Sequence, residues 1–200
     1  VYTATTDDID TEKVENFLSA RRNNRLGKVS DEVLMAYGVI VYEHSKLYPT
    51  VLGVLLFGRN PQHYFTEAMI ICSHFKGTSG RESIASVDCE GTLFQQFEQA
   101  YDFILSRLTY SFSIADLKRK ETLEIPAVAV REALLNTVAH RNYHIKAPTK
   151  IAIYEDRIEF FSPGQFPGPL DTNNLNKGIS YLRNPRICKV LREANYIEKL

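Results

Sequence analysis

The segment that begins at Pro126 constrains the fold more than any other part of the chain, because its periodicity changes from helical to extended. Pro126 suits the start of a helix, and apolar residues then recur at helical spacing to about His140. Two short strands follow at 150–154 and 157–161, separated by the tight turn Glu155-Asp156. A helix followed by an antiparallel pair of strands predicts a layer of helix packed on sheet.

The rest of the chain has the pattern of helices with a few strands. An acidic start, spaced apolar residues and a basic end predict an amphipathic helix over 7–26. Ser30-Asp31 can cap a second helix that Gly38 ends. The other expected elements are a strand at 68–75, a helix at 90–108, a hairpin at 110–125 and helical structure from Leu170 onward. We therefore predict an α+β fold: a mainly helical module of residues 1–88, with one or two strands, followed by a two-layer helix-on-sheet domain of residues 89–200.

Charge is balanced over the chain, since 24 Lys and Arg match 24 Asp and Glu. Because counterion release requires a concentrated basic surface, we expect this chain by itself to bind duplex DNA weakly. Its longest apolar runs, such as Val54–Phe57, are far shorter than the about 20 residues that span a bilayer. No signal-peptide pattern opens the sequence, so we expect no membrane partner.

Three cysteines, Cys72, Cys89 and Cys188, are widely separated and form no Cys-x-x-Cys pair. This spacing argues against a disulfide framework or a zinc knuckle, and it predicts reduced thiols in the core of a cytoplasmic protein. The chain begins at Val1 and ends at Leu200 within a charged stretch, so we expect it to be a piece of a longer protein.

Polar residues recur at intervals of four along the helix that starts after Pro126: Glu132, Asn136 and His140. This spacing drifts by only about 40° per step and forms one stripe on the helix. A carboxylate and an amide on one ridge suit a phosphate site, because an amide oxygen can ligate Mg²⁺ and a carboxylate can orient or deprotonate a water. By spacing alone the plainer interpretation, a polar face turned to water, is favoured.

The second strand leads into a loop rich in proline and glycine, from Ser162 to Gly168. Gly164 and Gly168 would let the backbone approach a ligand closely. However, Pro163 and Pro167 have no N–H to offer a phosphate, which makes this loop a poorer cradle than a Walker-type loop. Taken alone, the loop is better explained as a rigid turn.

Together, the helix, the two strands and the loop resemble a known arrangement. Glu132-x-x-x-Asn136 resembles the N box of GHKL ATPases, and Ser162-Pro163-Gly164 falls where their Asp-x-Gly-x-Gly box belongs. A closer resemblance is to the C-terminal ATPase-like domain of bacterial-type transcriptional regulators that are often labelled RecG-related helicases. The motifs that carry it are Glu132-Ala-Leu-Leu-Asn136, Ala139-His140-Arg141-Asn142-Tyr143, Asp156-Arg157-Ile158-Glu159, Ser162-Pro163-Gly164…Pro167-Gly168 and Arg183-Asn184-Pro185, with Leu55-Leu56-Phe57-Gly58-Arg59-Asn60-Pro61 and Phe75-Lys76-Gly77 upstream.

The resemblance implies a nucleotide site with ATP and Mg²⁺ as cofactors. It makes Asn136 the Mg²⁺ ligand and Glu132 the general base of a weak Mg²⁺-dependent ATPase. The residues that it further assigns to nucleotide binding are His140, Ser162, Gly164 and Gly168. Such regulators carry an upstream Schlafen-type AlbA domain, which would supply the contact with DNA, and a homodimer is a further expectation.

Two departures from the GHKL pattern define the alternative function. Ser162 replaces the aspartate that reads the adenine amino group, and a hydroxyl can accept a hydrogen bond but carries no charge. The final glycine box is expected just past Leu200. The alternative is therefore a degenerate GHKL-like scaffold for dimerisation or DNA docking that binds no nucleotide. The helicase label itself is unsupported, because no Gly-x4-Gly-Lys-Ser/Thr pattern occurs in the sequence.

Two further features have plain explanations. His140 and His144 are four residues apart, but no third metal ligand accompanies them. The pair Tyr64-Phe65 is expected in the core rather than as a base-stacking surface.

Overall fold

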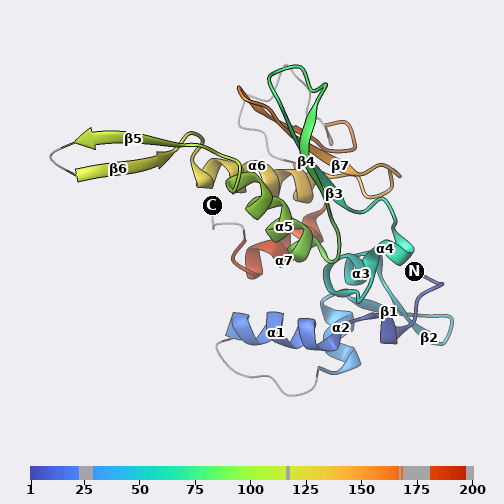
Figure 1. The fold of residues 1–200 in the computed structure, drawn as a ribbon. Helices are drawn as coiled ribbons and strands as arrows, with labels where there is room; N and C mark the ends of the chain where they lie inside the picture. The colour runs from blue at the N-terminus through green and yellow to red at the C-terminus, as the bar shows by residue number, and fades with distance from the viewer. Residues whose placement is uncertain (23–28, 116–117, 167, 169–180, 197–200) are drawn as a thin grey trace.

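The computed structural model describes residues 1–22, 29–115, 118–166, 168 and 181–196 (Figure 1). Its helices are the 3₁₀ turn Thr6–Asp8, α1 (Thr11–Arg22), α2 (Asp31–Ala36), α3 (Val51–Phe57), α4 (Pro61–Tyr64), α5 (Leu93–Leu105), α6 (Ala127–His140) and α7 (Pro185–Glu193). Its strands are β1 (Ile40–Glu43), β2 (Lys46–Pro49), β3 (Ile70–Phe75), β4 (Ser83–Cys89), β5 (Tyr110–Ala115), β6 (Lys118–Leu123), β7 (Thr149–Ile153) and β8 (Ile158–Phe161). The mixture confirms the α+β fold class.

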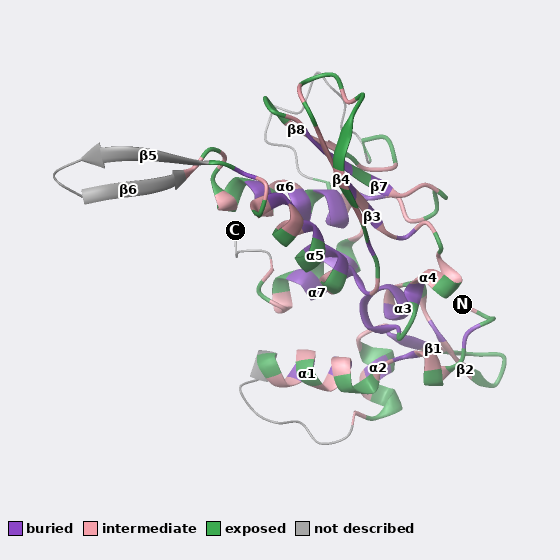
Figure 2. Ribbon diagram, in the orientation of Figure 1, coloured by how far each residue is buried: buried purple, intermediate pink, exposed green. Residues whose placement is uncertain are grey.

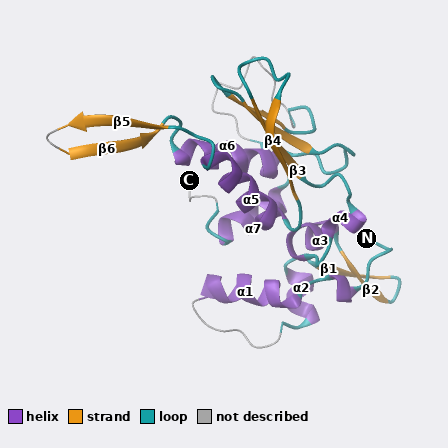
Figure 3. Ribbon diagram, viewed as in Figure 1, coloured by secondary structure: helices purple, strands orange, loops and turns teal. Residues whose placement is uncertain are grey.

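A four-stranded mixed sheet of order β4-β3-β7-β8 forms one layer of the fold (Figure 3). Its two outer pairs, β3–β4 and β7–β8, are antiparallel, whereas β3 and β7 run parallel. A parallel pair requires a long crossover connection, and here α5, the β5–β6 hairpin and α6 supply it. That hairpin projects away from the rest of the molecule (Figure 1).

Helices α5 and α6 cover one face of this sheet and bury its apolar side chains (Figure 2). The inward residues, each at most 2% exposed, include Ile70, Cys72, Cys89 and Ile151 on the strands and Leu93, Ile104 and Leu134 on the helices. On the other face Lys150 and Phe161, which pair in register, are exposed. The sheet is thus half-covered, and α6 is held in place by its apolar side.

The N-terminal part packs around α3, whose residues from Gly53 to Phe57 are buried. The Thr50 side chain caps α3 by accepting a hydrogen bond from the Gly53 backbone nitrogen at 2.9 Å. A Cβ at Gly53 would lie 2.1 Å from the carbonyl oxygen of Val39, so only glycine allows α3 to approach the residue before β1 this closely.

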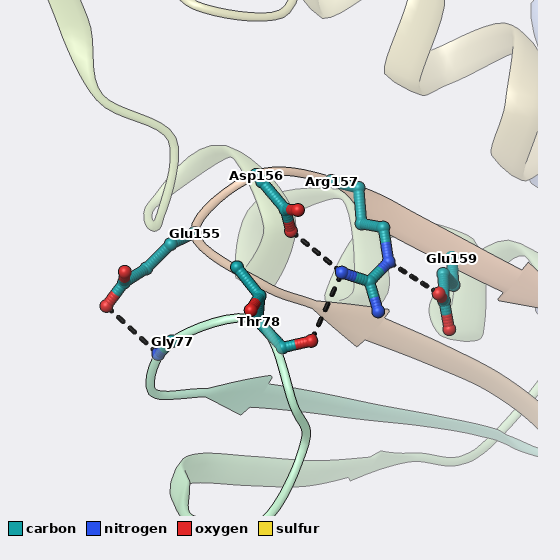
Figure 4. Close-up of polar contacts among 6 residues, drawn as sticks. All are labelled: Gly77, Thr78, Glu155, Asp156, Arg157 and Glu159. Carbon is teal, nitrogen blue, oxygen red and sulfur yellow. Dashed lines mark hydrogen bonds and ion pairs between the residues drawn. The ribbon is translucent and has the colours of Figure 1, made fainter.

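Two hairpin turns are bound together at one end of the sheet (Figure 4). The Gly77 backbone nitrogen donates to Glu155 Oε1 at 2.9 Å. Arg157 donates to the Thr78 carbonyl oxygen at 3.2 Å and to the Glu159 carboxylate at 2.6 Å. These contacts fix the β7–β8 turn against the β3–β4 turn, so the strand that leads into the proline-glycine loop has a defined position.

Most elements expected from the sequence are confirmed, including the helix after Pro126 and the two strands after it. All three cysteines are buried free thiols, as expected. The β1–β2 hairpin and β4 were not anticipated from the sequence. The four-stranded sheet contains strands from both sides of residue 88, and the division into two domains there stays a prediction. Within the described ranges, no helix combines the length and apolar character needed to cross a membrane.

Candidate functional site

Helix α6 presents Glu132 and Asn136 side by side on its exposed face. The amide nitrogen of Asn136 donates to Glu132 Oε1 at 3.1 Å. This hydrogen bond fixes which way the amide points, and it leaves the Asn136 Oδ1 oxygen without a hydrogen bond among the described residues. The structure therefore brings these two predicted residues together and offers an oriented amide oxygen to a ligand.

His140, the third member of the stripe, differs from them because it is half-buried. Burial lowers the pKa of its imidazole, and the nearby positive charge of Arg183 lowers it further. Both effects favour the neutral ring, which has one N–H donor and one acceptor nitrogen. His140 could thus accept as well as donate a hydrogen bond at this end of the stripe.

The loop after β8 docks on the C-terminal half of α6 and on the residues just after it, with one hydrogen bond to each. The Ser162 hydroxyl donates to the carbonyl oxygen of Thr137 at 3.1 Å, and the Asn142 backbone nitrogen donates to the carbonyl oxygen of Pro163 at 2.8 Å. The Ser162 proton is therefore used by the helix, while its oxygen lone pairs can still accept a hydrogen bond. This is the chemistry that an adenine amino group would require.

The two glycines of the loop are required for different local reasons. Gly164 adopts a φ of 124°, and a Cβ there would lie 3.0 Å from the Cβ of Asn142 and 3.4 Å from Nη2 of Arg183. Gly168 adopts a φ of 61°, and a Cβ there would lie 2.7 Å from ring atoms of Tyr181. Gly164 thus belongs to the junction with α6, whereas Gly168 packs against an aromatic ring.

Two residues that the sequence analysis assigned no role complete the junction. Arg183 donates from Nη2 to the carbonyl oxygen of Gln165. Asn184 donates from its amide nitrogen to the carbonyl oxygens of Ala139 at 2.9 Å and Arg141 at 2.7 Å. The only sequence signal for them was the Arg183-Asn184-Pro185 motif, because nothing in the local pattern shows that the start of α7 meets the end of α6.

The fit to an Mg²⁺-nucleotide can be judged from the donor set. Among the described residues no cluster of three or more His, Cys, Asp or Glu could hold a metal by itself. Mg²⁺ commonly keeps several waters and binds one or two protein oxygens together with substrate phosphates. The Asn136 oxygen and the adjacent Glu132 carboxylate fit that mode, since they would act on a metal that arrives with phosphate. Residues 169–180, which follow the loop, lie outside the described residues.

Comparison with known proteins agrees with part of this interpretation. Residues 146–200 match the family described as "Putative ATP-dependent DNA helicase recG C-terminal". The match contains β7, β8, the loop and α7, whereas α6 with Glu132 and Asn136 precedes it. The C-terminal part of the chain is therefore similar to an ATPase-like family domain.

A solved structure of similar fold is the DIP2311 protein from Corynebacterium diphtheriae. The two share 21% sequence identity with a TM-score of 0.74, and the similarity covers 98% of this chain but 38% of that chain. At this identity the likeness shows the fold alone, and the chain spans well under half of that relative's length. None of the curated proteins matches the sequence.

Proposed function

We propose that α6 and the loop after β8 form an Mg²⁺-nucleotide site, and that the chain is an ATP-binding regulatory module of a DNA-associated transcriptional regulator. The observation that carries the proposal is the 3.1 Å hydrogen bond from the Asn136 amide nitrogen to Glu132, which leaves the amide oxygen without a hydrogen bond among the described residues. Support also comes from the family match over residues 146–200 and from the resemblance of Glu132-x-x-x-Asn136 to the GHKL N box.

Each site residue has a defined task in this proposal. Asn136 would hold Mg²⁺ through its amide oxygen, and the metal would supply charge neutralisation for the phosphates of a bound nucleotide. Glu132 accepts the proton of an attacking water, which would make the domain a weak ATPase. Ser162 accepts a hydrogen bond from the base, and Gly164 keeps the loop close to α6. His140 lies at the end of the stripe, beside Arg183.

The wider role follows from the same resemblance. Contact with DNA would come from an upstream domain, because the balanced charge of this chain gives it little attraction for phosphate backbones. Nucleotide state would control domain arrangement or the formation of a homodimer in the cytoplasm.

A scaffold that binds no nucleotide is the second candidate function, and specific contacts favour it. The Ser162 hydroxyl proton is donated to α6, and Gly168 is explained by its packing on Tyr181 rather than by a phosphate. Glu132 and Asn136 would then be a solvated polar face of α6.

Thermal-shift titration with Mg²⁺ and ATP, ADP or GTP separates the two functions. A nucleotide at 100 times its Kd should stabilise the protein by about 2.7 kcal/mol. Asn136→Ala should weaken that binding by about tenfold or more and leave the ligand-free melting temperature unchanged, because the side chain is exposed. Asn16→Ala, which removes an exposed asparagine from α1, is the matched control and should bind as the unaltered protein does.

Absence of nucleotide binding would favour the scaffold function. If the unaltered protein shows no nucleotide-dependent shift and Asn136→Ala lowers the ligand-free melting temperature, then Asn136 has a structural role and the site assignment fails.

A further inference from the structure

A cleft of about 420 Å³ lies between residues 64–68, which lead into β3, and residues 141–146, which follow α6. Its volume lies within the range of about 300–1,000 Å³ that small-molecule sites occupy. Glu132 and Asn136 are absent from its lining, so it is separate from the nucleotide site proposed above. The charged and aromatic residues that line it are Tyr64, Phe65, Glu67, Arg141, Tyr143, His144 and Lys146.

Arg141 is the feature that distinguishes this cleft, because this charged residue is only 3% exposed. Its Nη2 nitrogen donates to the carbonyl oxygens of Glu67 at 2.5 Å and Ala147 at 2.8 Å. These bonds tie the end of α6 to the segments before β3 and β7. The Nε nitrogen of the same guanidinium is buried and has no hydrogen-bond partner.

The buried guanidinium of Arg141 forms no ion pair within the part of the chain that the structure describes. Both of its hydrogen-bond acceptors are uncharged carbonyl groups, and no carboxylate forms an ion pair with it there. Burial lowers the pKa of the Arg141 guanidinium, and the charge of Glu67, which lines the same cleft, partly offsets this without forming an ion pair. A buried arginine remains protonated and is costly unless anions compensate it, and Glu67 compensates this one only at a distance, so a bound anion would be favourable here.

The other lining residues indicate which kind of anion would fit the cleft. Two exposed residues also line the cleft: Lys146 would attract a ligand with more than one negative charge, and His144 offers an N–H donor. Tyr64, Phe65 and Tyr143 are half-buried and offer ring surfaces, and the Arg141 guanidinium lies 4.9 Å over the Tyr143 ring. An aromatic wall beside a cationic base suits a flat apolar group that carries an oxyanion.

We propose that this cleft binds a small aromatic phosphate monoester, with the phosphate toward Arg141 and Lys146 and the ring against Tyr64, Phe65 and Tyr143. The proposal does not depend on nucleotide binding at α6. It does give a route by which a ligand could affect that helix, since Arg141 directly follows His140 at the end of α6.

Binding is tested with phenyl phosphate at constant ionic strength, by thermal shift and by calorimetric titration. We expect saturable binding that is stronger than that of inorganic phosphate, which lacks the ring, and of benzoate, which carries less charge. Variants of Arg141 could fail to fold, so the test uses Lys146→Glu and Glu67→Gln instead. Lys146→Glu should weaken binding by about tenfold or more, because it replaces attraction by repulsion. Glu67→Gln should strengthen binding, because it removes the negative charge from the lining.

Two control variants test whether phenyl phosphate binds in this cleft. Lys150→Glu makes the same charge change at an exposed lysine of β7 outside the cleft, and it should leave the affinity unchanged. Asn136→Ala should also leave phenyl phosphate binding unchanged. The proposal is overturned if phenyl phosphate does not bind, if benzoate binds as tightly, if Lys150→Glu weakens binding as much as Lys146→Glu, or if Asn136→Ala abolishes binding while Lys146→Glu does not.

Discussion

The middle of α6 and its C-terminal end carry polar residues under opposite conditions. Glu132 and Asn136, on the exposed face, are hydrogen-bonded to each other. Beyond the last turn, Arg141 is buried and donates only to backbone carbonyls, while Asn184, the residue before α7, donates to the carbonyl oxygens of Ala139 and Arg141. Glu132 and Asn136 can exchange their hydrogen bond for bonds to water or a ligand at little cost. Arg141 instead links the end of α6 to the backbone before β3 and before β7.

This difference indicates which polar residues serve binding and which serve the fold. A helix leaves its last carbonyls without partners, and here side chains from elsewhere in the chain satisfy them. Such contacts are expensive to remove because the acceptor stays buried. The exposed pair has no such task, so substitutions there should change ligand binding without changing stability.

The largest loss of stability is expected for Arg141→Met, which keeps the volume of the side chain but removes its donors. The carbonyl oxygens of Glu67 and Ala147 would lose their partner, and the free energy of unfolding should fall by about 3 kcal/mol. Urea unfolding followed by circular dichroism measures the loss. Arg192→Met, at an exposed arginine of α7, should change stability by less than about 0.5 kcal/mol. Equal losses of stability in the two variants would show that the buried arginine is no more important for the fold than an exposed one.

A smaller loss is expected for Asn184→Asp, which keeps the shape but replaces a donor amide by an acceptor. The carboxylate would face the carbonyl oxygens of Ala139 and Arg141 at the negative end of the α6 dipole. We expect a loss of about 2 kcal/mol in the same unfolding assay. Asn16→Asp on the exposed surface of α1 is the control, and unchanged stability of Asn184→Asp would show that the two bonds contribute nothing.

His140 should produce a weaker effect that depends on pH. Burial and Arg183 lower its pKa in the folded state, so the unfolded state binds the proton more readily. The free energy of unfolding should therefore rise with pH between the lowered folded-state pKa and the ordinary value of about 6.5. Above that value the stabilising contribution of neutral His140 is complete. In His140→Gln this part of the pH dependence should be missing. Identical pH profiles of both proteins would refute the predicted shift.

The smallest effect on stability is expected for Glu132→Gln, within about 0.5 kcal/mol, because the side chain is exposed. Under the proposed function it should retain nucleotide affinity, since the shape is kept, while hydrolysis falls by about 10²- to 10⁴-fold through loss of the general base. Measured ATP turnover in both proteins decides the point. Binding without turnover in the unaltered protein would make the domain a nucleotide sensor, with no catalytic role for Glu132.

Local pattern was enough to predict the order of elements that frames the candidate site. Hydrophobic spacing and Pro126 predicted α6, and Glu155-Asp156 predicted the turn between β7 and β8. The spacing of Glu132 and Asn136 placed them on one face because helical geometry is local. The burial of the cysteines likewise followed from their number and separation.

Only the tertiary structure decided how distant segments combine. Strand β4 (Ser83–Cys89) lies at the edge of the sheet and contains several polar residues. Its sequence therefore has too few apolar residues to predict a strand, and its position depends on pairing with β3. The parallel pairing of β3 with β7 joins residues far apart in the chain. Arg141, an ordinary surface residue by type, is buried because backbone carbonyls from two other segments converge on it. The sequence by itself determined which faces are polar, because that depends on neighbours along the helix. Which polar group is enclosed depends on packing between segments, and that only the tertiary structure could decide.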